Sequence, residues 1–262
     1  MSTNFGAAAQ DYAQHRAGFP PELFERLDAF GIGEPGELHV DLGTGTGSFA
    51  RGVARRGGHV IGVDPDARLL HEAQRLDADE GLEVEYVLGC AEHIPLPAGV
   101  AQTVSAGQCW HWFDPARAAR EVARITQPGG RVVIAHFDWL PVPGNLVEAT
   151  ERLIVAHNPH WEWGGGDGIH TESVPHLRSA GFGDFATLSF ELAVPYSAEA
   201  WRGRIRASAG VGASLAPEAV RAFDAELAEL LARDFPGEGL SVPHRAFSLI
   251  GQRTTARPSL RS

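Results

Sequence analysis

Residues 40–50 read VDLGTGTGSFA: a short apolar run, an acidic residue, and three glycines that alternate with threonines or serine. The residues before the glycines, ELHVDLG (37–43), predict a buried strand, and SFARGVARR (48–56) has helical spacing. The glycines therefore form the turn between a strand and a helix N-terminus. Unpaired N–H groups and the helix dipole at such a turn favour a ligand with an anionic group.

Outward from this turn, short apolar strands alternate with amphipathic helices through the first 140 residues. Further strands are predicted at 58–64, 82–89, 100–107 and 131–138, and further helices at 21–30, 67–76 and 115–126. Pro128-Gly129-Gly130 is read as a breaker ahead of the strand at 131. Such alternation is typical of βαβ units and a parallel sheet.

The second half of the chain is less regular. It predicts strands at 185–194 and 242–253, helices at 143–157, 197–208 and 216–233, and a loop, HNPHWEWGGGDGIH, at 157–170. We therefore expect a single α/β domain with a seven-stranded, mostly parallel sheet flanked by helices. Helices inserted after residues 142 and 195 are expected to cap the ligand site.

Composition excludes several classes of function. A formal net charge of −11 gives no basic surface for nucleic acid or an anionic membrane. The N-terminus lacks a leader pattern and no long apolar run follows, so a cytoplasmic location is expected. All 22 basic residues are arginines, which excludes Walker-type and Schiff-base chemistry. Cys90 and Cys109 have no metal-type spacing, and we expect both to be buried.

The glycine spacing separates two ligand classes. A dinucleotide turn needs G-x-G-x-x-G, whereas Gly43, Gly45 and Gly47 give G-x-G-x-G with Asp41 in front. Asp41 adds negative charge where a pyrophosphate would lie, so it suits a ligand with a positive group better. S-adenosylmethionine (SAM) has such a group, its ammonium, which Asp41 and the backbone of Gly43, Thr44 and Gly45 can receive directly or through water.

Two later segments offer partners for the rest of SAM. Asp64 and Pro65 follow the second strand, where a carboxylate can accept both ribose hydroxyls, although dinucleotide folds use the same position. In GCAEHIPLP (89–97), a backbone amide near Ala91 can form a hydrogen bond with the adenine edge, and Glu92 can accept one from the adenine amino group. Gln108, after the fourth strand, completes the expected cofactor contacts.

The ordered motifs VDLGTGTG, VIGVDP, GCAEHIPLP and AGQCWHWFDPARAAREVARITQPGGRVVI resemble those of class I SAM-dependent methyltransferases. The HWFD signature resembles the sequence found in a small-molecule branch of this family, which includes trans-aconitate-type enzymes. The resemblance implies a Rossmann-like fold, and DYAQHRAGFP (11–20) implies that Tyr12 and Arg16 close over the methionine carboxylate. Three positions depart from the family pattern: Ala17, Cys90 and Gln102.

The resemblance implies four segments: an N-terminal helical segment (1–30) that closes the cofactor site, a SAM-binding core (31–142), the remainder of the sheet with substrate-capping insertions (143–253) and a flexible tail (254–262). The expected reaction is methyl transfer to a small organic acceptor through oxygen, sulfur, nitrogen or carbon. An NAD(P)-dependent oxidoreductase and a non-catalytic SAM-binding protein stay as alternatives.

Methyl transfer is an in-line displacement in which positioning supplies most of the catalysis. His111, beyond the fourth strand, is the candidate general base, and its alternative is a structural role. Trp110 and Trp112 are candidate walls of the acceptor pocket, with core packing as the alternative, and Trp161 and Trp163 a candidate lid. No metal is expected, because GQCWHW stands where metal-dependent relatives of the catechol type carry carboxylates.

Overall fold

The computed structural model describes residues 18–237 and 239–254, and the chain divides into two compact units. In its described residues, the sheet unit comprises 19–136, 170–189 and 247–254. The helical unit comprises Gly18, 137–169 and 190–246 without residue 238. The expected single domain is thus two units, because the inserted helices pack around a hydrophobic core of their own.

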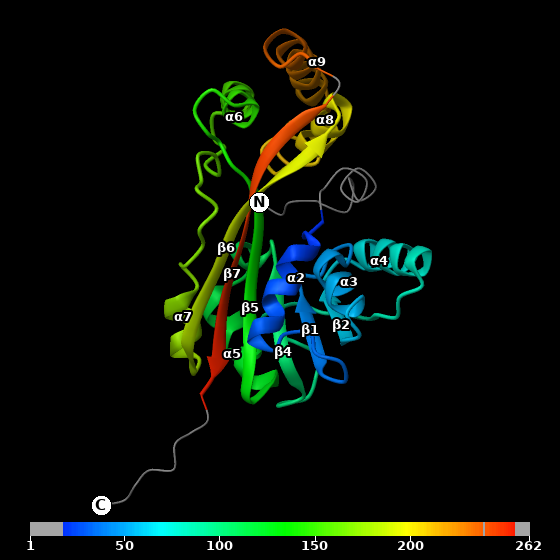
Figure 1. The fold of residues 1–262 in the computed structure, drawn as a ribbon, viewed down its shortest axis with the longest axis vertical. Helices are drawn as coiled ribbons and strands as arrows, with labels where there is room; N and C mark the ends of the chain where they lie inside the picture. Colours follow the sequence, from blue (N-terminus) through cyan, green and yellow to red (C-terminus); the bar gives the residue numbers. More distant parts are fainter. Residues whose placement is uncertain (1–17, 238, 255–262) are drawn as a thin grey trace, which may run out of the picture. The chain divides into compact units, whose positions relative to one another are not determined.

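The seven strands follow the order β3-β2-β1-β4-β5-β7-β6 (Figure 1). Their bounds are β1 (Leu38–Leu42), β2 (His59–Asp64), β3 (Glu85–Leu88), β4 (Ala101–Gly107), β5 (Thr126–Trp139), β6 (Phe182–Tyr196) and β7 (Leu240–Arg253). β1 pairs in parallel with β2 and β4, β2 with β3, and β4 with β5. Leu42 lies opposite both Val63 and Ala106, so the carboxyl ends of these strands meet at one edge.

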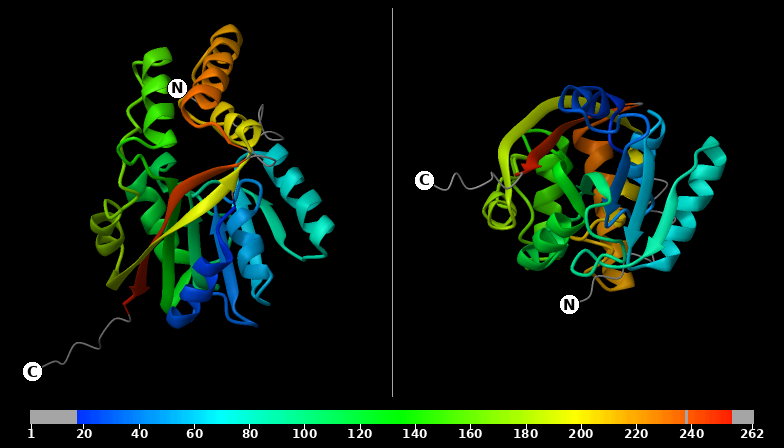
Figure 2. Two further views of the ribbon diagram at one scale, coloured as in Figure 1. Left: turned by 45° about the horizontal axis from the view of Figure 1, so that its top comes forward. Right: turned by 90° about the horizontal axis from the view of Figure 1, so that it is seen from below.

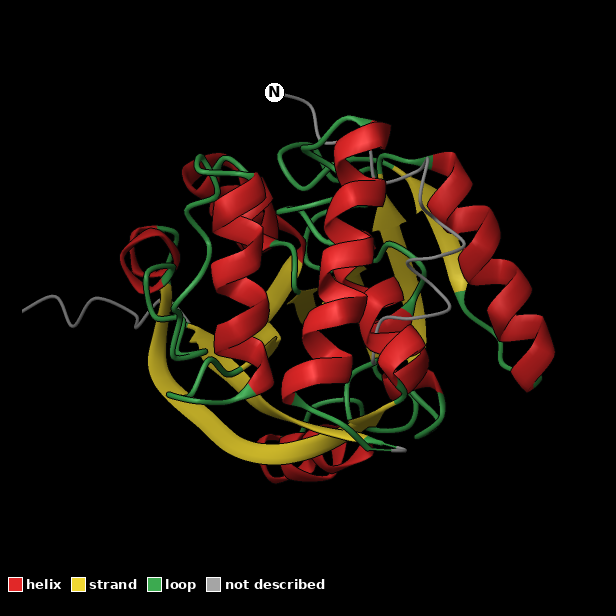
Figure 3. Ribbon diagram, turned by 90° about the horizontal axis from the view of Figure 1, so that it is seen from above, coloured by secondary structure: helices red, strands yellow, loops and turns green. Residues whose placement is uncertain are grey.

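Figure 3 shows the helices in red and the strands in yellow. In the sheet unit, the first helix after the glycine turn packs against β1 and β2, and the next one packs against β2 and β3. The helices of this unit are α2 (Pro21–Leu27), η2 (Asp28–Phe30), α3 (Ser48–Ala54), α4 (Ala67–Glu80), η3 (Trp110–Trp112), α5 (Pro115–Ile125) and α7 (Val174–Ser179). α5 begins as its sequence predicts: Pro115 is the first helical residue, and the Asp114 side chain accepts from the amides of Ala116 and Arg117. Val40, Leu42 and Val104 are fully buried in the core of this unit.

The helical unit contains α6 (Leu146–His157), α8 (Ala198–Arg206) and α9 (Pro217–Asp234). α6 and α9 pack against each other, green and orange in the left view of Figure 2. Trp201 and Phe223 are fully buried at the centre of this unit's core. Asn145 caps α6 by accepting a hydrogen bond from the Glu148 amide at 2.9 Å. The helices predicted after residues 142 and 195 are therefore confirmed.

One predicted boundary is wrong for a clear reason. Pro128-Gly129-Gly130 does not precede β5 but lies inside it. Ala101 pairs with Thr126 and Thr103 with Arg131, so the extra residues form an irregularity in the ladder rather than a break, and Gly129 takes a φ of +81° there. Among the described residues, no helix is both long and apolar enough to span a membrane.

Candidate active site

The glycine turn between β1 and α3 has the backbone that its sequence requires. Gly43, Gly45 and Gly47 have φ values of +56°, +57° and +79°, a region that side-chain-bearing residues rarely adopt. A Cβ at Gly43 would lie 2.8 Å from Cys109 Sγ, so protein atoms pack against this glycine. At Gly45 the nearest atom to such a Cβ would be 4.0 Å away, so Gly45 is the glycine that leaves space for a ligand.

Asp41 is buried beneath this turn. Its Oδ2 accepts a hydrogen bond from Thr44 Oγ1 at 2.7 Å and its Oδ1 one from Ser105 Oγ at 2.5 Å. Ser105 Oγ in turn lies 2.8 Å from His39 Nε2. Burial raises the pKa of the Asp41 carboxyl to about 6 and lowers the pKa of the His39 imidazole to about 3. Asp41 thus ties the turn to β4, which favours the backbone of the turn as the direct partner of a ligand ammonium.

Asp64, at the end of β2, lies next to the same turn. Its Oδ2 accepts from the Gly45 amide at 2.9 Å and its Oδ1 from the Asp66 amide at 2.9 Å. Burial raises the pKa of this carboxyl, and the two amide donors oppose that rise. The structure therefore brings Gly45 and Asp64, both predicted from sequence, into direct contact, while Pro65 is exposed beyond them.

A buried arginine supports the turn from the other side. Arg51 donates to the Thr46 carbonyl at 2.7 Å and to Asp77 Oδ1 at 3.1 Å. The ion pair joins α3 to α4, and both of its side chains are buried. The sequence analysis did not single out this support, because Arg51 and Asp77 stand 26 positions apart and meet only in the folded chain.

The end of β4 turns sharply at Gln108, whose φ of +60° is unusual for a residue with a side chain. The Gln108 amide donates to the Ala135 carbonyl at 2.8 Å. Trp110 packs in the core of the sheet unit, which was the predicted alternative to its forming a pocket wall. His111 is exposed, and Trp112 is 43 % exposed. Of the residues in η3, His111 and Trp112 are thus the two that are exposed.

Two histidines missed from sequence lie near His111. The His111 ring centroid is 6.1 Å from that of His136, on β5, and the His136 ring stacks on His170 at 3.7 Å. His136 is buried. His136 could have been identified from the sequence, because it lies near the carboxyl end of the fifth predicted strand. Ligands of such sheets bind at that edge.

The segment after β3 differs in part from expectation. Ala91 is buried, and Glu92 Oε1 accepts from the Asp114 amide at 2.8 Å, so Glu92 also holds the start of α5. Cys109 is buried as predicted and its thiol donates to the Leu42 carbonyl at 3.1 Å. The prediction for Cys90 is wrong: this side chain is exposed, because Cys90 lies beyond the end of β3 at Leu88 and not within the buried sheet.

The remaining predicted residues do not belong to the described part of the sheet unit. Tyr12 and Arg16 fall outside the described residues. Trp161 and Trp163 belong to the helical unit, in the stretch between α6 and α7, which has neither helix nor strand. Trp161 is partly buried and Trp163 is 54 % exposed.

The arrangement in the sheet unit fits SAM. An open backbone face at Gly45 adjoins a buried carboxylate at Asp64, so the turn places peptide groups and a carboxylate side by side. Neither lysine nor a third glycine in dinucleotide spacing is present in the sequence.

Comparison with known proteins agrees with this geometry. Residues 40–134 match the family described as "Methyltransferase domain". An uncharacterized methyltransferase of Mycobacterium tuberculosis is 38% identical over 132 residues, which covers 50% of this chain and 51% of the relative. This chain thus aligns with about half the length of that relative.

Solved structures show the same fold. The YcgJ protein from Bacillus subtilis has a TM-score of 0.58 at 18% identity, covering 90% of this chain and 99% of that one. Phosphoethanolamine N-methyltransferase 2 of Haemonchus contortus, solved with phosphomonomethylethanolamine and S-adenosylhomocysteine, has a TM-score of 0.56 at 18% identity, covering 95% and 58%. Residues 40–134 are thus similar to a methyltransferase domain, and the seven-stranded sheet has the Rossmann-like fold of these solved structures.

Proposed function

We propose that the chain is a SAM-dependent methyltransferase that methylates a small organic metabolite by metal-independent in-line displacement. The observation that carries this proposal is the contact between the Gly45 amide and the Asp64 carboxylate, beneath a turn whose three glycines all have positive φ. The methyltransferase domain matched by residues 40–134 supports it.

Most of the predicted cofactor residues have a role in this proposal. The Asp64 carboxylate accepts the ribose hydroxyls, and the carbonyls of Gly43, Thr44 and Gly45 receive the ammonium. Ala91, Glu92 and Gln108 border the adenine. Tyr12 and Arg16 hold the methionine carboxylate.

When bound, SAM supplies an electrophilic methyl group. The residues of the chain orient the acceptor in line with it and exclude water, and this positioning lowers the barrier. His111 is exposed beside Trp112, with ring centroids 4.8 Å apart. Its imidazole is the group that takes a proton from an acceptor hydroxyl in this proposal. Trp112 offers an apolar wall to the same acceptor.

The net charge of the chain supports the proposed acceptor class. A net charge of −11 opposes a polyanionic acceptor such as RNA or DNA. The HWFD segment, similar to the trans-aconitate-type branch, supports a small metabolite. The Haemonchus enzyme, of the same fold, was solved with a small phosphoamine.

An assay of methyl transfer tests the proposed function. The protein is incubated with SAM and a panel of small alcohols, acids, thiols and amines, and S-adenosylhomocysteine is quantified by mass spectrometry. We expect release that depends on one acceptor class and is lost in Asp64→Asn. Tight cofactor binding with no turnover on any class would contradict the enzymatic proposal and favour a non-catalytic SAM-binding protein.

A further inference from the structure

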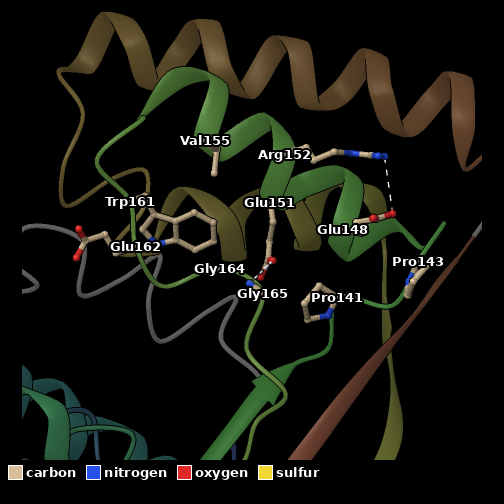
Figure 4. Close-up of a pocket in the computed structure, with 10 residues that line it drawn as sticks. All are labelled: Pro141, Pro143, Glu148, Glu151, Arg152, Val155, Trp161, Glu162, Gly164 and Gly165. Atoms are coloured by element: carbon tan, nitrogen blue, oxygen red, sulfur yellow. Dashed lines mark hydrogen bonds and ion pairs between the residues drawn. The ribbon is translucent and has the colours of Figure 1, made fainter.

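The helical unit contains a pocket of about 500 Å³ beside α6 (Figure 4). All of its lining residues belong to this unit. Pro141, Val155 and Trp161 give it apolar walls. A pocket of this volume holds a small organic molecule, and the polar groups in its wall decide which one.

The polar group that indicates the class of ligand is the carboxylate of Glu151. The residue is 8 % exposed, and its carboxylate forms part of the pocket wall. Its Oε1 accepts from the Trp139 indole N–H at 2.8 Å and its Oε2 from the Gly165 amide at 2.8 Å. These two neutral donors fix the orientation of the carboxylate and leave each oxygen able to accept another hydrogen bond.

Glu151 also lacks a counter-charge within the part of the chain that the structure describes. The nearby cation in the wall, Arg152, pairs instead with Glu148, at 3.9 Å between Nη2 and Oε2. Burial raises the pKa of the Glu151 carboxyl. A buried carboxylate without a cation is costly, and a positively charged ligand would supply the missing partner.

Glu162 adds a second acidic group to the lining. Glu148, Glu151 and Glu162 against Arg152 leave the wall with a net charge of −2, that is, three carboxylates less one guanidinium. The pocket therefore favours a cation over a neutral or anionic molecule.

The Trp161 indole lies beside this carboxylate. A Cβ placed on Gly164 would be 2.9 Å from Trp161 Cζ3 and 3.4 Å from Glu151 Oε2, so the ring and the carboxylate converge on the same glycine. Figure 4 shows the two side chains reaching toward the loop that carries Gly164 and Gly165. An indole next to a carboxylate suits an ammonium group that has an apolar substituent.

We propose that this pocket binds a small organic amine as its ammonium ion, with the nitrogen at Glu151 and the apolar part against Trp161 and Val155. The inference goes beyond the proposed function, because it concerns ligand binding within the helical unit and does not depend on where SAM binds.

The binding test uses two probes of nearly equal shape on the unmodified protein. 2-Phenylethylamine carries an ammonium at neutral pH, and 2-phenylethanol carries a hydroxyl in its place. We expect the amine to bind at least tenfold more tightly by calorimetric titration. Equal affinity for the two probes, or binding of the alcohol alone, would overturn the proposal. The absence of detectable binding by either probe would overturn it as well.

Variants then locate the site. Glu151→Gln keeps the shape and removes the charge, and we expect it to weaken amine binding at least tenfold. Glu229→Gln, an exposed acid on α9 outside the pocket lining, is the matched control and should bind as the unmodified protein does. Gly164→Ala, which forces the indole to move, should also weaken binding. Unchanged amine affinity in both Glu151→Gln and Gly164→Ala would overturn the placement.

A separate titration with S-adenosylhomocysteine keeps this inference distinct from the proposed function. If the amine binds and S-adenosylhomocysteine does not, the amine site stands and the methyltransferase proposal fails. If S-adenosylhomocysteine binds and the amine does not, the amine inference alone is wrong.

Discussion

The backbone amide of Gly45 donates a hydrogen bond to Asp64 Oδ2 at 2.9 Å, which joins the turn after β1 to the carboxyl end of β2. Asp64 Oδ1 accepts from the Asp66 amide as well, so both oxygens have fixed directions. A carboxylate held in this way loses little conformational entropy when a ligand binds, and under the proposed function that ligand group is the ribose of the cofactor.

Replacing Asp64 tests this role. Asp64→Asn removes the charge and turns an NH₂ group toward a backbone amide or toward the ligand. We expect S-adenosylhomocysteine affinity to fall about 10- to 100-fold, as for the loss of a charge-assisted hydrogen bond. Calorimetric titration measures it, with Asp79→Asn, an exposed acid on α4, as the control. Equal affinity in Asp64→Asn and the control would place the ribose elsewhere.

The glycines of the turn should separate stability from binding. Alanine at Gly43 or Gly45 costs about 1 to 2 kcal/mol of backbone strain at positive φ. Gly43→Ala also places its methyl group against Cys109 Sγ, so its free energy of unfolding should be the lower of the two in urea denaturation.

Gly45→Ala should show the opposite pattern. Its methyl group enters the open space at the turn, so S-adenosylhomocysteine affinity should drop while most of the stability is kept. A Gly45→Ala protein that binds the cofactor product normally would show that this face of the turn does not meet the ligand.

His39 predicts a pH dependence of stability. Burial lowers its pKa from 6.5 to about 3, so between these values the unfolded chain binds more protons than the folded one. The free energy of unfolding therefore falls as the pH drops through this window, by at most about 1.4 kcal/mol per pH unit. His39→Gln cannot ionise, and its stability should decline less from pH 6.5 to pH 4.

The Asp41 carboxyl acts with the opposite sign. Its pKa is raised from 3.8 to about 6, so its contribution to stability falls as the pH rises through that range. Both proteins contain Asp41, and urea denaturation of the pair at several pH values isolates the effect of His39. Parallel pH curves for the two proteins would contradict the buried, neutral imidazole.

Metal independence is a further expectation. In-line transfer from SAM needs positioning rather than a Lewis acid, so methyl transfer should keep its full rate after treatment with EDTA. Activity lost with EDTA and restored by magnesium or zinc would contradict it, and the stacked His136 and His170 would be the first residues to replace.

The local part of the site could be predicted from sequence. The strand, the glycines and the helix N-terminus lie within a dozen residues, and β1 and α3 begin and end within two residues of prediction. The positive φ of each glycine follows from the turn itself. The same local logic predicted the two inserted groups of helices.

The parts that depend on distant residues could not be predicted. Asp41 meets Ser105 across 64 positions, and no periodicity in a single sequence reports that contact. His136 and His170 stack only because the fold brings β5 and the segment before α7 together. The separate core around Trp201 and Phe223 likewise arises from packing among α6, α8 and α9.

The most direct test of the central claim is calorimetric titration of the full chain with S-adenosylhomocysteine, with NADH as the parallel control. The account predicts binding of S-adenosylhomocysteine at micromolar strength or better, about −8 kcal/mol, and none of NADH. Binding of NADH without S-adenosylhomocysteine would contradict the account and assign the glycine turn to a dinucleotide.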